Sequence, residues 1–310
     1  MSRTTQTTNE TKELGFSIRQ GVDWTNYVLY RPIYQESFFT RIFDYHAQKP
    51  KASWSAAHDI GAGHGIASST IASRFDHVVV SDPNDGYTQI ARKLLVEQSG
   101  FSDSKFTFLQ EGAEKSSVES GSIDLITACE CMQWTNTEAA VDEFARQLRP
   151  GGTLVMTYYT RPLIVGNERA QNVWKAIFEA YSQHATGDLL DRAFKTLNNG
   201  FDSIALPEEQ WQTVKRVYIN ASQGIASFKL NDRVGEDKVG KNEERVWVNG
   251  DPDWSDNQDI DWIKKYFATW VPPLPESEIQ GLWDELERVL DGGKAHLETP
   301  IAMVFATKRT

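Results

Sequence analysis

The segment DIGAGHG, residues 59–65, carries an acid and three glycines on alternate positions directly after a short apolar run. Glycine lets a ligand approach the backbone closely, so a loop of this composition is suited to a nucleotide-like cofactor. A second acid, Asp82, follows the next apolar run and is placed to accept hydrogen bonds from ribose hydroxyls. The dinucleotide fingerprint needs glycine where this chain has Ile66, so the spacing favours a cofactor without a pyrophosphate.

Apolar runs alternate with helix-like segments through the same region. Strands are expected over 56–60, 77–81, 106–109, 123–128 and 153–159. Helices are expected over 66–75 and 87–99, and a third helix begins at a capping-box pattern, Thr135 to Glu138. This alternation predicts an α/β fold with a parallel sheet and helices on both faces. Turn residues and acids follow successive strands, so we expect them to meet at the carboxyl edge of the sheet.

The chain divides into segments of different character. We expect a disordered tail (1–15), an N-terminal helical cap (16–50), a cofactor-binding core (51–160), a variable acceptor-binding or cap region (161–300) and a last strand of the core sheet (301–310).

Five motifs in the core carry a family resemblance: DIGAGHG, VVVSDPN, QEGAEKS, IDLITACECMQW and LRPGGTLVMTYY. Together they resemble class I S-adenosylmethionine-dependent methyltransferases. The resemblance implies a doubly wound, mostly parallel, seven-stranded Rossmann-like sheet with a helical cap. The segment YVLYRPIY, residues 27–34, is similar to a signature of the fungal trans-aconitate methyltransferase-like subgroup.

The resemblance also implies which residues surround S-adenosylmethionine. They are Tyr27, Arg31, Asp59, Gly61, Ala62, Gly63, Asp82, Pro83, Asn84, Ala113, Glu114 and Cys129. In this assignment Asp59 fixes the glycine loop, Asp82 holds the ribose and Glu114 reads the adenine edge. Arg31 is a candidate for the cofactor carboxylate, because its planar guanidinium matches that group.

A departure from the family concerns catalysis. Relatives tend to carry His-Trp where this chain has Gln133-Trp134, and glutamine takes no proton at neutral pH. A carboxylate acceptor needs no base because it is already ionised, so the change favours carboxylate methylation or a base elsewhere. Gln133, Trp134 and His64 are the catalytic candidates, with His184 a further histidine to consider; each also fits a purely structural role.

The acceptor site is expected among aromatic and basic side chains near the strand ends. Trp134, Tyr159 and Arg161 are the substrate-binding candidates. Tyr158, Trp174, Trp262 and Trp270 could line the same pocket or belong to the core.

Composition restricts the partners. The net charge is −11 and no basic run occurs, so we expect a small-molecule acceptor and no nucleic acid. No apolar run approaches the ~20 residues that span a bilayer, and Cys129 and Cys131 are too close for a zinc knuckle. We therefore expect a cytoplasmic enzyme with no membrane partner and no metal.

These features predict methylation of a small molecule, most simply at an oxygen and plausibly at a carboxylate. Two alternatives stay open at the level of sequence. One is a catalytically altered protein of this fold, either a regulator or a cofactor-assisted non-methylating enzyme. The other is an NAD-dependent oxidoreductase, against which Ile66 argues.

Overall fold

An eight-stranded sheet forms the centre of the molecule, in the order β3-β2-β1-β4-β5-β11-β7-β8. The computed structural model describes residues 23–49 and 52–310; the expected tail, residues 1–15, and the start of the N-terminal segment, 16–22, lie outside them. The strands are β1 (Ala56–Ile60), β2 (His77–Ser81), β3 (Phe106–Leu109), β4 (Ile123–Cys129), β5 (Leu148–Tyr159), β7 (Trp211–Ile219), β8 (Glu244–Val248) and β11 (Ile301–Lys308).

The first five strands run parallel, and β11 lies antiparallel between β5 and β7. The prediction of a mostly parallel α/β sheet that takes in the C-terminal strand is confirmed. The number of strands differs, because β8 pairs with β7 in parallel and adds an eighth strand to the described part of the sheet. Val246 and Val248 of β8 are partly buried against the hydrophobic core cluster on one face of the sheet.

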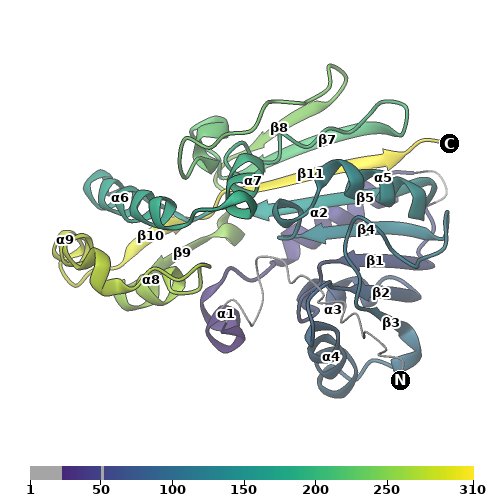
Figure 1. Cartoon of the computed structure of the whole chain (residues 1–310), viewed down its shortest axis with the longest axis horizontal. Helices are drawn as coiled ribbons and strands as arrows, with labels where there is room; N and C mark the ends of the chain where they lie inside the picture. Colours follow the sequence, from purple (N-terminus) through teal and green to yellow (C-terminus); the bar gives the residue numbers. More distant parts are fainter. Residues whose placement is uncertain (1–22, 50–51) are drawn as a thin grey trace, which may run out of the picture.

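Helices cover both faces of the sheet, as expected for a doubly wound fold (Figure 1). They are α2 (Glu36–Ala47), α3 (Ile66–Ala72), α4 (Tyr87–Arg92) and α5 (Thr137–Gln147). Successive side chains of a strand point to opposite faces of the sheet. Val78 and Val80 belong to the core cluster that contains Ile71 of α3, whereas Val79 belongs to the cluster that contains Phe144 of α5.

Three helix boundaries differ from the sequence prediction. Helix α3 ends at Ala72, three residues before the expected end at 75. Helix α4 ends at Arg92, and residues 93–98 continue as a π-helical turn rather than as one helix to 99. Helix α5 is capped by Asn136, whose side chain accepts from the Ala139 N–H, and not by Thr135. The Thr135 hydroxyl instead donates to the Met132 carbonyl, which removes it from the capping position.

A smaller body lies at the carboxyl ends of the parallel strands, toward which the arrows of β4 and β5 point (Figure 1). Its antiparallel sheet has the order β6-β10-β9, from β6 (Leu163–Val165), β9 (Ser255–Gln258) and β10 (Ala295–Glu298). Its helices are α6 (Glu168–His184), α7 (Asp188–Leu197), α8 (Ile260–Phe267) and α9 (Gln280–Leu290). Helix α1 (Trp24–Tyr30) packs against α8. The expected variable region thus supplies the small body, while its β7 and β8 belong to the main sheet.

Within residues 23–49 and 52–310, no helix combines the length and apolar character needed to cross a membrane. Both cysteines, Cys129 and Cys131, are free thiols.

Candidate functional site

A cleft opens where the carboxyl ends of β1, β2 and β4 face α1. It encloses about 1100 Å³, counting its open mouth. Eleven of the twelve predicted cofactor residues line it: Tyr27, Arg31, Asp59, Gly61, Ala62, Gly63, Asp82, Pro83, Asn84, Ala113 and Cys129. Its wall also contains Tyr34, His64, Glu130, Cys131, Trp134 and Tyr159, among others. The sheet topology therefore brings together residues that lie up to 132 positions apart, as Tyr27 and Tyr159 do.

The glycine loop lies tight against the end of β4. Gly61 has φ +61°, and a Cβ atom there would stand 2.5 Å from the Cβ of Cys131. Only glycine satisfies both the left-handed backbone and this contact. Gly65 has a different role, since it begins α3 at φ +86° against Ala91 and Leu95 of the following helical segment.

We expect Gly61→Ala to lower the melting temperature more than Gly121→Ala. Gly121 has a similar φ of +65° but open space around its missing side chain, so it isolates the cost of the backbone conformation. The additional loss at Gly61 reports the collision with Cys131. Equal shifts of the two melting temperatures would contradict the packing described here.

Two buried carboxyl groups hold the loop in place. Asp59 accepts hydrogen bonds from the Ser68 hydroxyl (2.6 Å) and the Thr127 hydroxyl (2.8 Å), which joins α3 to β4. Asp82 accepts from the Gly63 N–H (3.0 Å) and the Asn84 N–H (2.9 Å). Burial raises the pKa of both carboxyls to about 6, so both are ionised at neutral pH.

Glu114 is the predicted cofactor residue that does not line the cleft. Its carboxylate accepts from the Asn136 N–H at 2.8 Å, one residue before α5 begins. A carboxylate at a helix N-terminus is stabilised by the exposed amides there, which explains why the side chain turns toward the helix. Its neighbour Ala113 does line the cleft.

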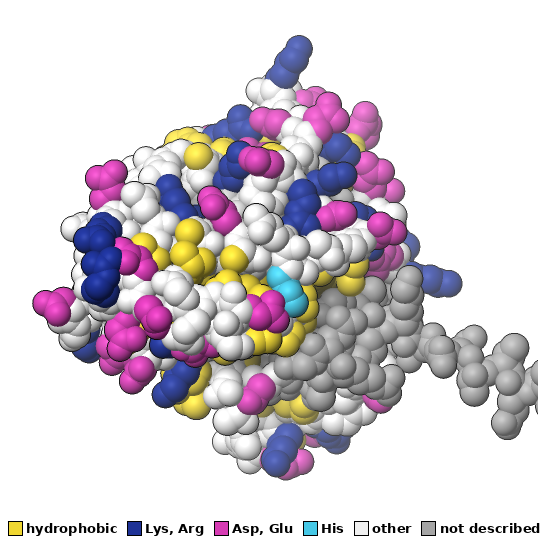
Figure 2. Space-filling model, turned by 60° about the vertical axis from the view of Figure 1, so that its left-hand side comes forward, with side chains coloured by type: hydrophobic (Ala, Val, Ile, Leu, Met, Phe, Trp, Pro, Cys, Tyr) yellow, Lys and Arg dark blue, Asp and Glu magenta, His cyan; other side chains and the backbone are white. Residues whose placement is uncertain are grey.

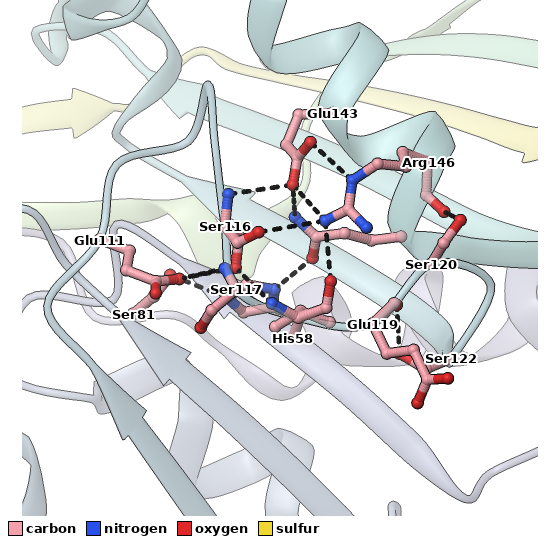
Figure 3. Close-up of polar contacts among 12 residues, drawn as sticks. His58, Ser81, Glu111, Ser116, Ser117, Glu119, Ser120, Ser122, Glu143 and Arg146 are labelled. Atoms are coloured by element: carbon pink, nitrogen blue, oxygen red, sulfur yellow. Dashed lines mark hydrogen bonds and ion pairs between the residues drawn. The ribbon is translucent and has the colours of Figure 1, made fainter.

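The loop that carries Ala113 is fixed from behind by a polar network (Figure 3). Glu143 of α5 accepts from the Ser116 N–H at 3.0 Å, and Arg146 donates to the Ser116 carbonyl at 3.2 Å. Glu111 accepts from the Ser117 N–H at 2.8 Å. Burial lowers the pKa of His58, inside the same network, to about 4, so this histidine is neutral and structural. The network thus links the loop that carries Ala113 to α5.

A second cavity of about 620 Å³ adjoins the cleft. The two cavities share Tyr27, Arg31, Glu130, Trp134 and Tyr159. The remaining lining of the second cavity is mostly apolar or aromatic: Gln133, Tyr158, Tyr181, Leu190, Ala193, Phe194, Leu197, Trp270 and Val271. The large cleft and the second, largely aromatic cavity are therefore adjacent, and the five shared side chains form the boundary between them.

Four of the residues suggested for the acceptor site line this second cavity, namely Trp134, Tyr158, Tyr159 and Trp270. Trp174 lies in the core of the small body instead, and Trp262 stacks on Tyr266 at 5.6 Å.

Arg161 also lies away from the second cavity. The chain turns after β5, so its guanidinium lies 5.6 Å from the ring of Phe178 on α6 and borders a separate surface cavity. His184 is exposed near the end of α6, outside both the cleft and the second cavity.

Arg31 stands at the junction of the two cavities and is held from the small body. Its Nε donates to the Thr269 hydroxyl at 2.7 Å and its Nη2 to the Thr269 carbonyl at 3.2 Å. The rings of Tyr27, Tyr266 and Trp270 surround its guanidinium at 4.8–5.4 Å. The junction therefore carries a fixed positive charge within an aromatic cage.

Glu130 is the junction residue that sequence reasoning missed. It follows Cys129 at the end of a fully buried strand and has φ +58°, a conformation uncommon for a residue with a side chain. Its Oε1 accepts from the Tyr159 N–H. An acid directly after an apolar run, inside the motif ACECMQW, was the available signal.

The three catalytic candidates occupy different places. Gln133 is buried and lines the second cavity. Its side-chain amide donates to the Glu130 carbonyl at 2.9 Å, and its Oε1 has no described hydrogen-bond partner. Trp134 lies at the junction. His64 lies in the cleft beside Tyr27, where burial lowers its pKa to about 4, which makes it a weak base at neutral pH.

Comparisons with known proteins agree with this architecture. A family model described as a methyltransferase domain matches residues 58–156. The methyltransferase ptaI of Pestalotiopsis fici is 30% identical, and the alignment covers 94% of this chain and 95% of that protein. The methyltransferase cfoB of Aspergillus candidus is 28% identical, with 97% and 99% covered. A solved structure from Anaeromyxobacter dehalogenans, provisionally assigned as a type II methyltransferase, shares the fold with a TM-score of 0.58. It is 16% identical, and the match covers 89% of this chain and 97% of that one.

Fold, cleft and relatives together define the class: the chain belongs to the class I S-adenosylmethionine-dependent methyltransferases. It is a methyltransferase, and the two relatives named above are fungal methyltransferases matched over nearly their full length.

Proposed function

We propose that this methyltransferase binds S-adenosylmethionine in the cleft and transfers its methyl group to an oxygen of a small molecule held in the second cavity. The observation that carries the proposal is the direct junction of the two cavities through Tyr27, Arg31, Glu130, Trp134 and Tyr159. A group transfer between two bound molecules needs this arrangement, because both reactants must be held in contact and away from water.

The charges of the cleft fit this cofactor. Two ionised carboxylates line it, Asp59 and Asp82, against the single arginine, Arg31, found among the described lining residues. A pyrophosphate would be repelled by such an excess of acids, whereas a sulfonium cation is stabilised by carboxylates and by the faces of aromatic rings. The electrostatics therefore support S-adenosylmethionine over a nicotinamide dinucleotide.

The cofactor supplies a methyl group on a positively charged sulfur, and the chain must bind and align it. Asp82 would accept from the ribose hydroxyls, with Pro83, Asn84 and Ala113 beside the adenine. The backbone of Gly61, Ala62 and Gly63 would lie along the methionine part, near the Cys129 carbonyl. Tyr27 and Arg31 would bind the cofactor carboxylate, since Arg31 presents a fixed planar donor set.

The lining of the second cavity favours a small acceptor molecule that is apolar and contains a ring. Tyr158, Tyr181, Phe194 and Trp270 provide ring faces and edges, and Gln133 and Trp134 line the pocket toward the junction. A carboxylate acceptor, one of the two options that Gln133 left open at the level of sequence, would react without a base. A hydroxyl acceptor would need a base at the junction, so the choice between them depends on the charged groups found there.

A small-molecule acceptor also fits the surface charge. The net charge is −11, and Figure 2 shows acidic and basic side chains interspersed over one face of the molecule rather than a basic stripe. This distribution gives a nucleic acid no favourable surface on that face.

The direct test is a screen of carboxylic acids and phenols with the full chain and S-adenosylmethionine, with release of S-adenosylhomocysteine as the readout. We expect S-adenosylhomocysteine to be released with members of one of these two acceptor classes. Calorimetry should show that one molecule of S-adenosylmethionine binds per chain. A protein that binds reduced nicotinamide dinucleotide and not S-adenosylmethionine would contradict the proposal.

A further inference from the structure

We propose that Glu130 is the general base of the reaction, and that the acceptor it serves is a phenolic or enolic hydroxyl bound in the second cavity. This inference rests on the proposed function and names the class of acceptor. Glu130 lines both cavities at their junction, where an acceptor oxygen must meet the methyl donor.

The geometry leaves one oxygen of Glu130 for this task. Oε1 is held by the Tyr159 N–H, which orients the carboxyl group. Among the described residues no side chain donates to Oε2, and the residue is partly exposed toward the cavities. Its main chain is held as well, since the Glu130 N–H donates to the Thr157 carbonyl at 3.0 Å and the Glu130 carbonyl accepts from Gln133 at 2.9 Å. A carboxylate fixed in this way, in a left-handed conformation, is typical of a functional position.

Several titratable side chains lie around Glu130. They come from α1, β4, β5 and α8 and from the segments beside them: Tyr27, Arg31, Tyr34, Cys129, Cys131, Tyr158, Tyr159 and Tyr266. Burial raises the pKa of each of these phenols and thiols, so Arg31 is the charged member of the described set. Burial also raises the pKa of Glu130 to about 8, opposed by the Tyr159 N–H and by Arg31. Such a value is well matched to taking a proton from a phenol near neutral pH.

The aromatic lining selects the acceptor. Tyr158, Phe194 and Trp270 line the second cavity, so a flat acceptor ring would contact aromatic side chains there, with its hydroxyl directed to the junction. In the reaction the acceptor O–H bond breaks and its proton goes to Oε2 of Glu130. The acceptor oxygen forms a bond to the methyl carbon, and the electron pair of the broken carbon–sulfur bond stays on sulfur. The proton then leaves Glu130 for solvent.

The protonation of Glu130 can be tested without any acceptor. Its pKa in the folded protein lies above the value in the unfolded chain, so its stabilising contribution is complete below about pH 4.5 and is lost as the pH rises through about 8. We expect the melting temperature of the wild type to fall more steeply from pH 6 to pH 9 than that of Glu130→Gln. Identical pH dependence in the two proteins would overturn the proposal, because Glu130 would then not change protonation in this range.

The catalytic role is tested with naphthols and phenols against the naphthoic and benzoic acids of the same ring systems. We expect methylation of the hydroxyl series, with kcat reduced roughly 10²–10⁴-fold in Glu130→Gln and the rising limb of its pH profile lost. Glu130→Asp should keep that limb, and Glu138→Gln, at an exposed carboxylate of α5, should resemble the wild type.

Calorimetry separates the possible failures. The affinity for S-adenosylmethionine should change only a few-fold in Glu130→Gln. A large loss of that affinity with an unchanged saturating kcat would show that Glu130 binds the cofactor instead of acting as the base. Methylation of the acids but not of the hydroxyl compounds would also overturn the proposal. A wild type that binds no S-adenosylmethionine would contradict the proposed function itself.

Discussion

Replacing Asp82 by alanine is expected to weaken binding of S-adenosylmethionine by roughly 10²–10⁴-fold. The cofactor would lose two charge-assisted hydrogen bonds to its ribose, each contributing about 1.5–3 kcal/mol. The loop would also lose its anchor, because Asp82 holds the N–H groups of Gly63 and Asn84. Calorimetric titration of the variant with S-adenosylmethionine gives the measurement.

Two variants accompany Asp82→Ala. Asp82→Asn keeps an oxygen acceptor but loses the charge, so its affinity should lie between those of the wild type and the alanine variant. Asp85→Ala removes an exposed carboxylate that does not line the cleft, and its affinity should equal that of the wild type. An unchanged affinity in Asp82→Ala would refute the assignment of the ribose to this residue.

The second large effect is expected from filling the acceptor pocket. Ala193 of α7 is 2% exposed and faces the second cavity but not the cleft. Ala193→Trp should lower kcat/KM for the acceptor by roughly 10²-fold, because the indole occupies the space of the acceptor ring. The affinity for S-adenosylmethionine should stay within a few-fold of the wild-type value. Steady-state kinetics and calorimetry on the same preparation measure the two quantities.

Arg192→Trp is the matched control for the pocket variant. Arg192 is the preceding residue on α7 and is exposed, so the same ring is introduced on the solvent side of the helix. We expect wild-type kinetics for this control. If Ala193→Trp kept full activity, the acceptor would have to bind outside the second cavity.

Several strands of the core could be predicted from sequence because they are buried and therefore have a clear apolar pattern. The expected bounds of β1, β2 and β3 agree with the structure, since each is a short apolar or β-branched run closed by turn residues. Strand β9 has the sequence SDNQ, which shows no apolar alternation. It forms because β10 pairs with it, a tertiary cause that no local pattern contains.

The cofactor residues were predicted from the family resemblance, and the sheet topology explains why most of the eleven that line the cleft lie together. Parallel strands end at one edge, so residues that follow β1, β2 and β4 must converge there. Glu114 departs from this rule because the exposed amides before α5 compete for its carboxylate. Arg161 departs because the chain leaves β5 toward α6. Glu130 was missed because its importance arises from the junction between two cavities, which exists only in the folded chain.

The central claim is that one cleft binds S-adenosylmethionine and delivers its methyl group into the adjoining cavity. A crystal structure of the full chain grown with S-adenosylhomocysteine tests this claim most directly. We expect the ribose hydroxyls at hydrogen-bond distance from Asp82, about 2.5–3.0 Å, and the sulfur at the junction beside Glu130 and Trp134. S-adenosylhomocysteine bound outside the cleft, or with its sulfur turned away from the second cavity, would contradict the account.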